Sequence, residues 1–212
     1  MRRSFLLVSF VVVFLTMAAL CVQAQTGRVK LTVYRLPELK LNISLPSDYC
    51  VITRTKVTHP ELLKERNIDV KAIQLTFPQS GIFLNAMPRE FDSEYVLTSF
   101  NYEGSNQIGD FSNYSEEALA ELVTPETLAE EYQAMGVDAR PEPTERINGK
   151  VYFVLTVRQS QNGGGFIYTR QYSTIVGGAA VNLAYNKLTG SINDEEKAKQ
   201  RAIVESIVFN KS

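Results

Sequence analysis

Few side chains in this sequence have the types and spacing that covalent or metal-assisted chemistry needs. The one histidine is His59, beside Pro60, and the two cysteines are Cys21 and Cys50. A nucleophile triad needs a histidine oriented by a third group, and the usual zinc site needs several histidine or cysteine ligands. His59 is typical of a loop or helix cap, and Cys50, in the apolar "DYCVITR", of a small buried side chain. We therefore expect no cofactor and no metal site, and the sequence favours a protein that is not an enzyme.

Carboxylates are the remaining source of acid–base chemistry. They occur as neighbours in residues 92–94, 116–117, 130–131 and 194–196. Neighbours on a helix point in different directions, so such pairs are typical of solvated faces and caps. An extracytoplasmic hydrolase that uses carboxylates alone stays open as the alternative, and it would need a deep cleft in which two carboxylates converge.

Three consecutive glycines, Gly163 to Gly165, raise the question of phosphate binding. A phosphate loop leads from a strand into the N-terminus of a helix, whose N–H groups bind the anion. Here the next residues are "FIYTRQYSTIV", which are β-branched and aromatic. The pattern therefore predicts a tight turn between antiparallel strands.

Tyrosine is the enriched binding-type residue of the C-terminal third, and arginines accompany it. Strand alternation places Tyr168, Arg170 and Tyr172 on one face of a strand. In the preceding strand, Tyr152 and Arg158 share a face. Tyrosine and arginine often anchor protein interfaces. We expect Tyr168, Arg170 and Tyr172 to form a partner surface, unless a helix of the protein itself covers that face.

The elements that must position these residues follow from periodicity and turn signals. Asn148-Gly149 is a strong hairpin signal, and Asn193 with Glu196 has the spacing of a capping box. The order of elements predicts an α+β fold with a largely antiparallel sheet. The expected strands are 29–34, 39–46, 49–54, 81–88, 93–103, a hairpin over 145–159, 165–176 and 179–187, and the expected helices are 59–67, 113–123, 124–136 and 193–209.

The N-terminus is typical of an export signal. Arg2 and Arg3 precede the apolar run from Phe5 to Leu20, and Val22-Gln23-Ala24 offers small residues for cleavage before Gln25. Residues 1–24 are therefore the expected signal, and 25–212 the expected single α+β domain. Retention as a membrane anchor is the alternative, because the run approaches the length that spans a bilayer. Lipidation at Cys21 is disfavoured by Leu20, which stands where a small residue is wanted.

Removal of the signal changes the charge and leaves one cysteine. It takes away two of the 22 basic residues and none of the 23 acidic ones, which leaves a charge of −3 on the mature chain. Without a basic block, nucleic acid is not an expected partner. Cys50 alone makes no intramolecular disulfide, so packing must provide the stability.

Several stretches, in this order, resemble the exported bacterial proteins of the Mog1/PsbP-like class. They are "ISLPSDYCVITR", "LKERNIDVKAI", "IGDFSNYSEEALAEL", "ERINGKVYFVLTV", "YSTIVGGAAVNLAY" and "IVESIVF", within residues 40–209. The resemblance implies an antiparallel sheet sandwiched between helices. Its better-known members, an extrinsic subunit of photosystem II and a partner of the Ran GTPase, are not enzymes, and neither role carries over to this chain. We therefore expect an exported, non-enzymatic accessory or binding protein of the cell envelope, with an unknown partner.

Overall fold

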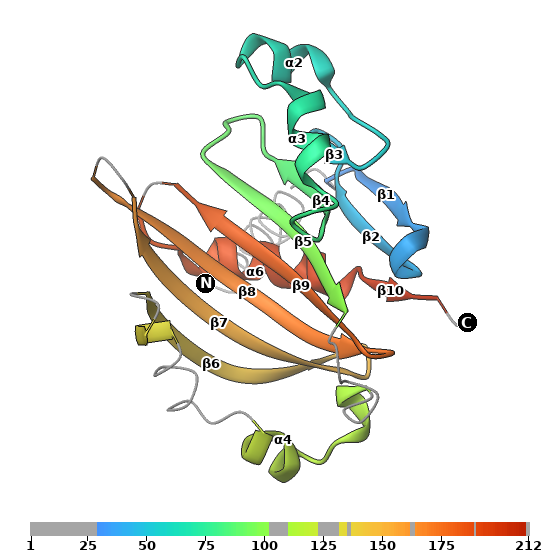
Figure 1. Cartoon of the computed structure of the whole chain (residues 1–212), viewed down its shortest axis with the longest axis vertical. Coiled ribbons are helices and arrows are strands. Elements are labelled where there is room, and N and C mark those ends of the chain that lie inside the picture. Colours follow the sequence, from blue (N-terminus) through green and yellow to red (C-terminus); the bar gives the residue numbers. More distant parts are fainter. Residues whose placement is uncertain are drawn as a thin grey trace, which may run out of the picture.

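The computed structural model describes residues 29–101, 110–122, 132–134, 137–161, 164–188 and 190–210. The expected signal peptide lies outside these residues, as does most of the expected helix 124–136. The described strands form two antiparallel sheets, one of seven strands in the order β3-β4-β5-β9-β8-β7-β6 and one of three in the order β1-β2-β10 (Figure 1).

The large sheet is built mainly from hairpins between strands that are neighbours in sequence. Asn148 and Gly149, both at positive φ, form the turn between β6 and β7, as predicted. The glycine cluster also turns a hairpin: Gln161 N–H donates to the Gly165 carbonyl at 3.1 Å, and β7 and β8 pair on either side. The predicted turn is therefore confirmed, although Gly163 itself is not among the described residues. The strands are β3 (Cys50–Thr53), β4 (Ile82–Met87), β5 (Ser93–Asn101), β6 (Asp138–Ile147), β7 (Lys150–Ser160), β8 (Phe166–Val176) and β9 (Ala179–Lys187).

The small sheet joins the start and the end of the described chain. It contains β1 (Leu31–Leu36), β2 (Leu41–Pro46) and β10 (Val208–Phe209), and η1 (Pro37–Leu39) makes the connection between β1 and β2. The expectation of a helix up to residue 209 is wrong at its end, because β10 pairs with β2 instead. Ser206 lies between α6 and β10 and fixes the chain to β2. Its hydroxyl donates to the Ser44 carbonyl and accepts from the Ser44 N–H.

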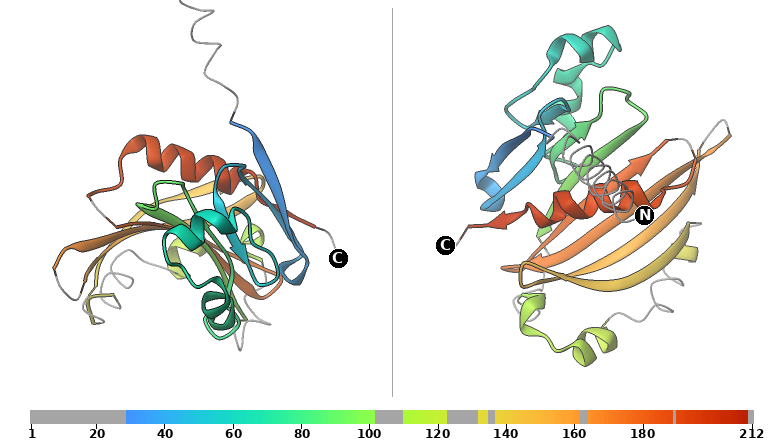
Figure 2. Two further views of the ribbon diagram at one scale, coloured as in Figure 1. Left: turned by 90° about the horizontal axis from the view of Figure 1, so that it is seen from above. Right: turned by 180° about the vertical axis from the view of Figure 1, so that it is seen from behind.

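Helix α6 (Asp194–Glu205) lies across one face of the large sheet (Figure 2). It begins with the predicted capping box of Asn193 and Glu196, and it buries Gln200, Ile203 and Val204. The main core lies between α6, the inner face of β2 and one face of the large sheet. Its larger aliphatic side chains with no exposed surface are Leu41, Ile43, Leu45, Leu84, Leu97 and Val204.

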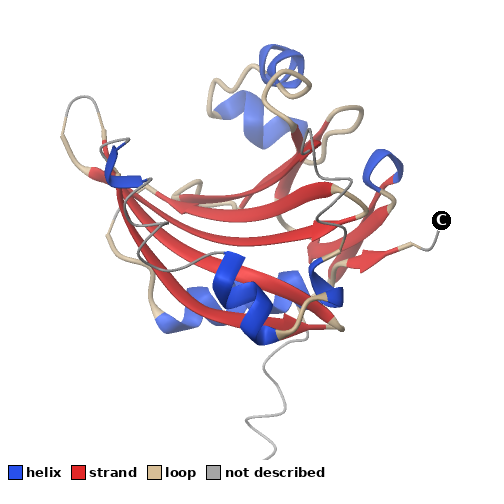
Figure 3. Cartoon of the chain, turned by 60° about the horizontal axis from the view of Figure 1, so that its bottom comes forward, coloured by secondary structure: helices blue, strands red, loops and turns tan. Residues whose placement is uncertain are grey.

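The other helices are short. Helices α2 (Pro60–Glu65) and α3 (Val70–Thr76) cover the outer side of β3 through Leu63 and Phe77. On the face of the sheet opposite α6, η3 (Phe111–Asn113) and α4 (Glu116–Leu122) pack through Phe111 and Leu119 against one end of β7 and β8 (Figure 3). The α+β class and the antiparallel sheet are thus confirmed. A sheet sandwiched between helices is not seen in the described part of the chain, where one long helix covers one face.

Candidate functional site

The expected partner surface on β8 lies mostly inside the molecule. Tyr168, Arg170 and Tyr172 do share one face of the strand, but that face lies under α6. Arg170 is 4% exposed and Tyr172 1%, while Tyr168 is half-buried. Gln200 of α6 donates to the Arg170 carbonyl at 2.7 Å and accepts from its guanidinium at 3.3 Å. The prediction of an open face is therefore corrected: Arg170 and Tyr172 are core residues.

Arg170 is the centre of a charged network between β6, β8 and α6. Its guanidinium binds Glu142 through Nε at 3.0 Å and Nη2 at 2.8 Å, and Nη2 lies 3.5 Å from Glu145. Arg201 of α6 reaches the second oxygen of Glu145 at 3.0 Å, and the Tyr172 hydroxyl donates to Glu145 at 2.8 Å. Burial alone would raise the pKa of the Glu142 carboxyl, but hydrogen bonds from Arg170 and Thr156 hold that pKa below its ordinary value.

Glu142 and Glu145 are thus two converging carboxylates, but both are committed to arginine. A general acid needs a raised pKa, which a carboxylate gains from apolar surroundings or a second charge of the same sign. Arg170 produces the opposite effect on Glu142. The arrangement joins the helix to the sheet and gives no support to the hydrolase alternative.

The two residue types that nucleophilic chemistry would use are also structural. Cys50 is fully buried and packs with Leu63 and Phe77, and burial raises the pKa of its thiol. His59 precedes α2 as its N-cap residue and lies 3.1 Å from the Ser47 carbonyl through Nε2. Both positions agree with the sequence analysis. The described residues contain no group of three or more histidine, cysteine or acidic side chains placed to hold a metal ion.

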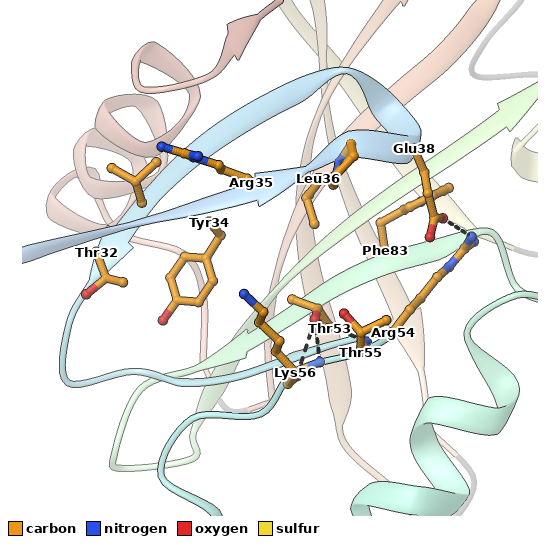
Figure 4. Close-up of a pocket in the computed structure, with 12 residues that line it drawn as sticks. Thr32, Tyr34, Arg35, Leu36, Glu38, Thr53, Arg54, Thr55, Lys56 and Phe83 are labelled. Atoms are coloured by element: carbon orange, nitrogen blue, oxygen red, sulfur yellow. Dashed lines mark hydrogen bonds and ion pairs between the residues drawn. The ribbon is translucent and has the colours of Figure 1, made fainter.

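A cleft lies where the small sheet meets the large one. It has a volume of about 650 Å³ and is lined by β1 and η1 on one side and by the end of β3 and the turn after it, residues 53–56, on the other, with Phe83 of β4 beside Arg54 and Glu38 (Figure 4). This is the size of a ligand pocket. Sequence analysis missed it. The local signal was the run Arg54-Thr55-Lys56 after a strand, but only long-range pairing brings that run opposite β1.

Arg54 is held in a fixed position in the cleft. Its Nε donates to the Ile82 carbonyl at 2.9 Å, its Nη1 binds Glu38 at 2.5 Å, and its guanidinium carbon lies 3.6 Å from the centre of the Phe83 ring. Stacking on an aromatic ring and a charge-assisted hydrogen bond both restrict the guanidinium. Its side chain still keeps 24% of its surface exposed, so part of this oriented cation faces the cleft.

Lys56 is the second cation of the cleft. The turn that carries it is fixed, since Lys56 N–H donates to the Thr53 hydroxyl at 2.9 Å and Thr53 N–H donates to the Lys56 carbonyl at 2.8 Å. Its side chain is exposed and has no ion-pair partner in the described residues. Figure 4 shows Tyr34 and Lys56 directed into the space between β1 and the turn.

The charge of the cleft is opposite to that of the whole chain. Glu38 is the one carboxylate among the described lining residues, and Arg54 already neutralises it. Arg35 and Lys56 therefore leave a net positive charge in a protein whose net charge is −1. The Tyr34 hydroxyl is neutral at pH 7 and can donate a hydrogen bond, and burial raises its pKa further. The arrangement is suited to an anionic group on a partly apolar ligand.

A row of hydrogen-bonded polar side chains, which the sequence analysis also missed, crosses the face of the large sheet opposite α6. Glu94 accepts hydrogen bonds from Asn85 at 2.7 Å and from Asn186 at 2.9 Å, and the Thr169 hydroxyl donates to Asn186 at 2.8 Å. This row joins β4, β5, β9 and β8. Its members bind mainly one another, so it stabilises that face of the sheet and is a weaker candidate than the cleft.

Comparisons with known proteins bear on the fold. No family model matches the chain, and no curated protein sequence matches it. Among solved structures, it is similar to the solution structure of cyanobacterial PsbP (CyanoP) from Synechocystis, with 12% identity, 87% of this chain and 95% of that chain covered, and a TM-score of 0.50. It is less similar to a protein of Bacteroides thetaiotaomicron, with 9% identity, 85% and 48% covered and a TM-score of 0.44. A protein of unknown function from Pseudomonas aeruginosa gives 12% identity, 86% and 99% covered and a TM-score of 0.40. The likeness to CyanoP shows that this chain has a PsbP-like fold.

Proposed function

We propose that this protein is an exported accessory protein of the cell envelope, that it acts by binding a partner and not by catalysis, and that its binding site is the cleft beside β1. We also propose that it belongs to the Mog1/PsbP-like class, which the shared fold supports.

The observation that carries the proposal is the pairing of an oriented cation with an uncommitted one. Arg54 is fixed by Glu38 and Phe83, and Lys56 extends from a rigid turn toward the same space. Fixed polar groups at the wall of a partly apolar cleft give orientation and specificity to binding. Glu38, the one carboxylate of the cleft, is bound to Arg54 and is not free to act as a general acid or base.

Export is supported by the N-terminal sequence, with its basic start, its apolar run and the small residues before Gln25. No helix among the described residues has the length and apolar character to cross a membrane. Intact-mass measurement of the protein from its native host tests the proposal. A chain that begins at Gln25 supports cleavage, a chain that keeps residues 1–24 supports the anchored alternative, and a lipid adduct at Cys21 would contradict both.

The binding role is tested by capture of a partner from the envelope fraction of the native host. Lys56→Glu reverses the uncommitted charge of the cleft, and we expect it to weaken capture by about tenfold or more, as the loss of a charged contact does. Lys71→Glu is the matched control, because Lys71 lies exposed on α3 and does not line the cleft. Equal capture by the two variants would exclude the cleft as the binding site.

A further inference from the structure

The cleft lies along a strand edge that no described residue occupies. β1 is the last strand of the small sheet and pairs with β2 alone. Ser47 N–H donates to the Lys30 carbonyl at 2.8 Å, which identifies the hydrogen-bonded pairs of this antiparallel ladder. Because such pairs alternate, Thr32 and Tyr34 bond to β2, while Leu31, Val33 and Arg35 direct their N–H and C=O groups to the free edge.

The lining of the cleft shows that this edge faces it. Every residue from Thr32 to Glu38 lines the cleft. Successive side chains of a strand point to opposite faces, so side chains from one face alone would give every second residue. A run of consecutive lining residues is expected when the backbone edge of the strand itself forms the wall of the cleft. The turn from Thr53 to Lys56 lies across the space from it (Figure 4).

The side chains on the two faces of β1 differ in character. On the outer face, Leu31 is 56% exposed and Val33 60%, which are apolar positions without cover. On the inner face, the neighbours of a strand added to β1 would include Lys56 and Arg54. Cross-strand pairs of apolar side chains, and of opposite charges, stabilise adjacent strands.

We propose that the occupant of the cleft is an extended peptide segment of a partner that alternates apolar and acidic residues and adds to the free edge of β1 as a fourth strand. Its main chain bonds to Leu31, Val33 and Arg35. Its apolar residues lie beside Leu31 and Val33, and its acidic residues face Lys56 and Arg54. Strand addition to an exposed sheet edge is a general mode of peptide recognition. This inference rests on the proposed function, since it names the partner of the same cleft.

A second copy of the chain fits the edge less well. On the face of Lys56, a second β1 would bring Lys30, Thr32 and Tyr34, which include a cation and no carboxylate, and like charges on adjacent strands are destabilising. The charge of the cleft therefore favours an acidic strand over self-association.

Amide hydrogen exchange on the full chain from its native host tests the strand pairing directly. The probe is an acetylated, amidated eight-residue peptide of alternating valine and glutamate. At saturation, we expect it to slow exchange of the Leu31, Val33 and Arg35 amides by tenfold or more, whereas the Thr32 and Tyr34 amides, already bonded to β2, keep their rates. A valine–lysine peptide of the same length should give no protection.

Two variants at one position separate the backbone contact from the side chain. Val33→Pro removes an N–H that points to the free edge and breaks no bond to β2, a position at which edge strands accept proline. It should weaken binding of the valine–glutamate peptide about tenfold, as the loss of a hydrogen bond at the centre of the added strand does. Val33→Ala keeps the N–H and should change affinity less than the proline variant.

The outcomes distinguish this inference from the proposed function. Two results would overturn strand addition: peptide binding that leaves the three amides unprotected, and equal peptide affinity of the Val33→Pro and Val33→Ala variants. Either result would do so even if Lys56→Glu still abolishes capture of the native partner. No binding of the valine–glutamate peptide at millimolar concentration overturns it as well. Protection of the same amides without peptide, rising with protein concentration, would identify a second copy as the occupant instead. If Val33→Pro does not fold, the exchange pattern of the unaltered chain still decides.

Discussion

At the scale of single residues, Arg170 connects β6 to α6. It holds Glu142 by three hydrogen bonds, lies near Glu145 and binds Gln200, and its own side chain is 5% exposed. Arg170→Met leaves Glu142 without its main partner, whereas Glu145 keeps Arg201 and Tyr172, so we expect a loss of roughly 3 kcal/mol in the free energy of unfolding, as for a broken buried pair. Urea unfolding measures it. The double variant that adds Glu142→Gln removes the unpaired charge and should recover part of the loss; no recovery would contradict the charge argument.

The same network predicts how stability depends on pH. The pKa of Glu142 lies below its ordinary value in the folded protein, because the hydrogen bonds from Arg170 and Thr156 outweigh burial. A depressed pKa means that the folded state binds the proton less readily than the unfolded state, so the stabilisation is present at neutral pH and is lost on acidification. We expect the free energy of unfolding to fall as pH drops below about 4.3, the ordinary value for glutamate. Glu142→Gln should flatten this fall, and an unchanged slope would assign it to other carboxylates.

At the scale of elements, two glycines at turns differ in what surrounds them. Gly164 has φ +95 and open space where a side chain would begin, whereas at Gly81, with φ +62, a Cβ would lie 2.8 Å from the Ser99 carbonyl oxygen and 2.6 Å from the Phe100 ring. Gly164→Ala should therefore cost about 1 kcal/mol through backbone strain alone. Gly81→Ala should cost clearly more, because the carbonyl belongs to paired β5 and has little room to move. Equal urea midpoints for the two variants would contradict this reading.

The elements also show how far the sequence predicts this fold. The hairpins, the capping box at Asn193 and the antiparallel sheet follow from local patterns and are confirmed. The start of β6 at Asp138 was missed because Pro141 and Pro143 argue against a strand. β6 is an edge strand with an irregularity between Glu142 and Glu145, and such a position accepts proline.

The candidate site could not be predicted from local patterns, because it depends on how distant elements pack. Alternation placed Tyr168, Arg170 and Tyr172 on one face correctly, but whether that face is open depends on where α6 packs. The cleft depends on contact between β1 and residues 53–56, which the register of two different sheets decides. Local periodicity carries no information on either point.

At the scale of the whole molecule, the two ends of the described chain stabilise each other. Val208 and Phe209 pair with Asn42 and Leu41 of β2, and Asn210 N–H donates to the Lys40 carbonyl at 2.7 Å. Ile207, 4% exposed, belongs to the main core beneath the same sheet. A chain that ends at Ser206 loses this pairing and the buried isoleucine, and we expect it to lose roughly 3 kcal/mol or more in the free energy of unfolding.

The effect of this truncation should extend to the cleft, because β1 rests on β2, and β2 then lacks a partner on its other edge. Amide exchange in β1 and β2 should quicken more than in β7 and β8, which form the far part of the other sheet, and the valine–glutamate peptide should bind more weakly. A chain that ends at Asn210 keeps β10 and serves as the control, with stability and peptide affinity near those of the full chain. If the chain ending at Ser206 matched that control in urea midpoint and in β1 exchange, the C-terminal strand would have no part in holding the small sheet, and the wall of the cleft would depend on β2 and the core alone.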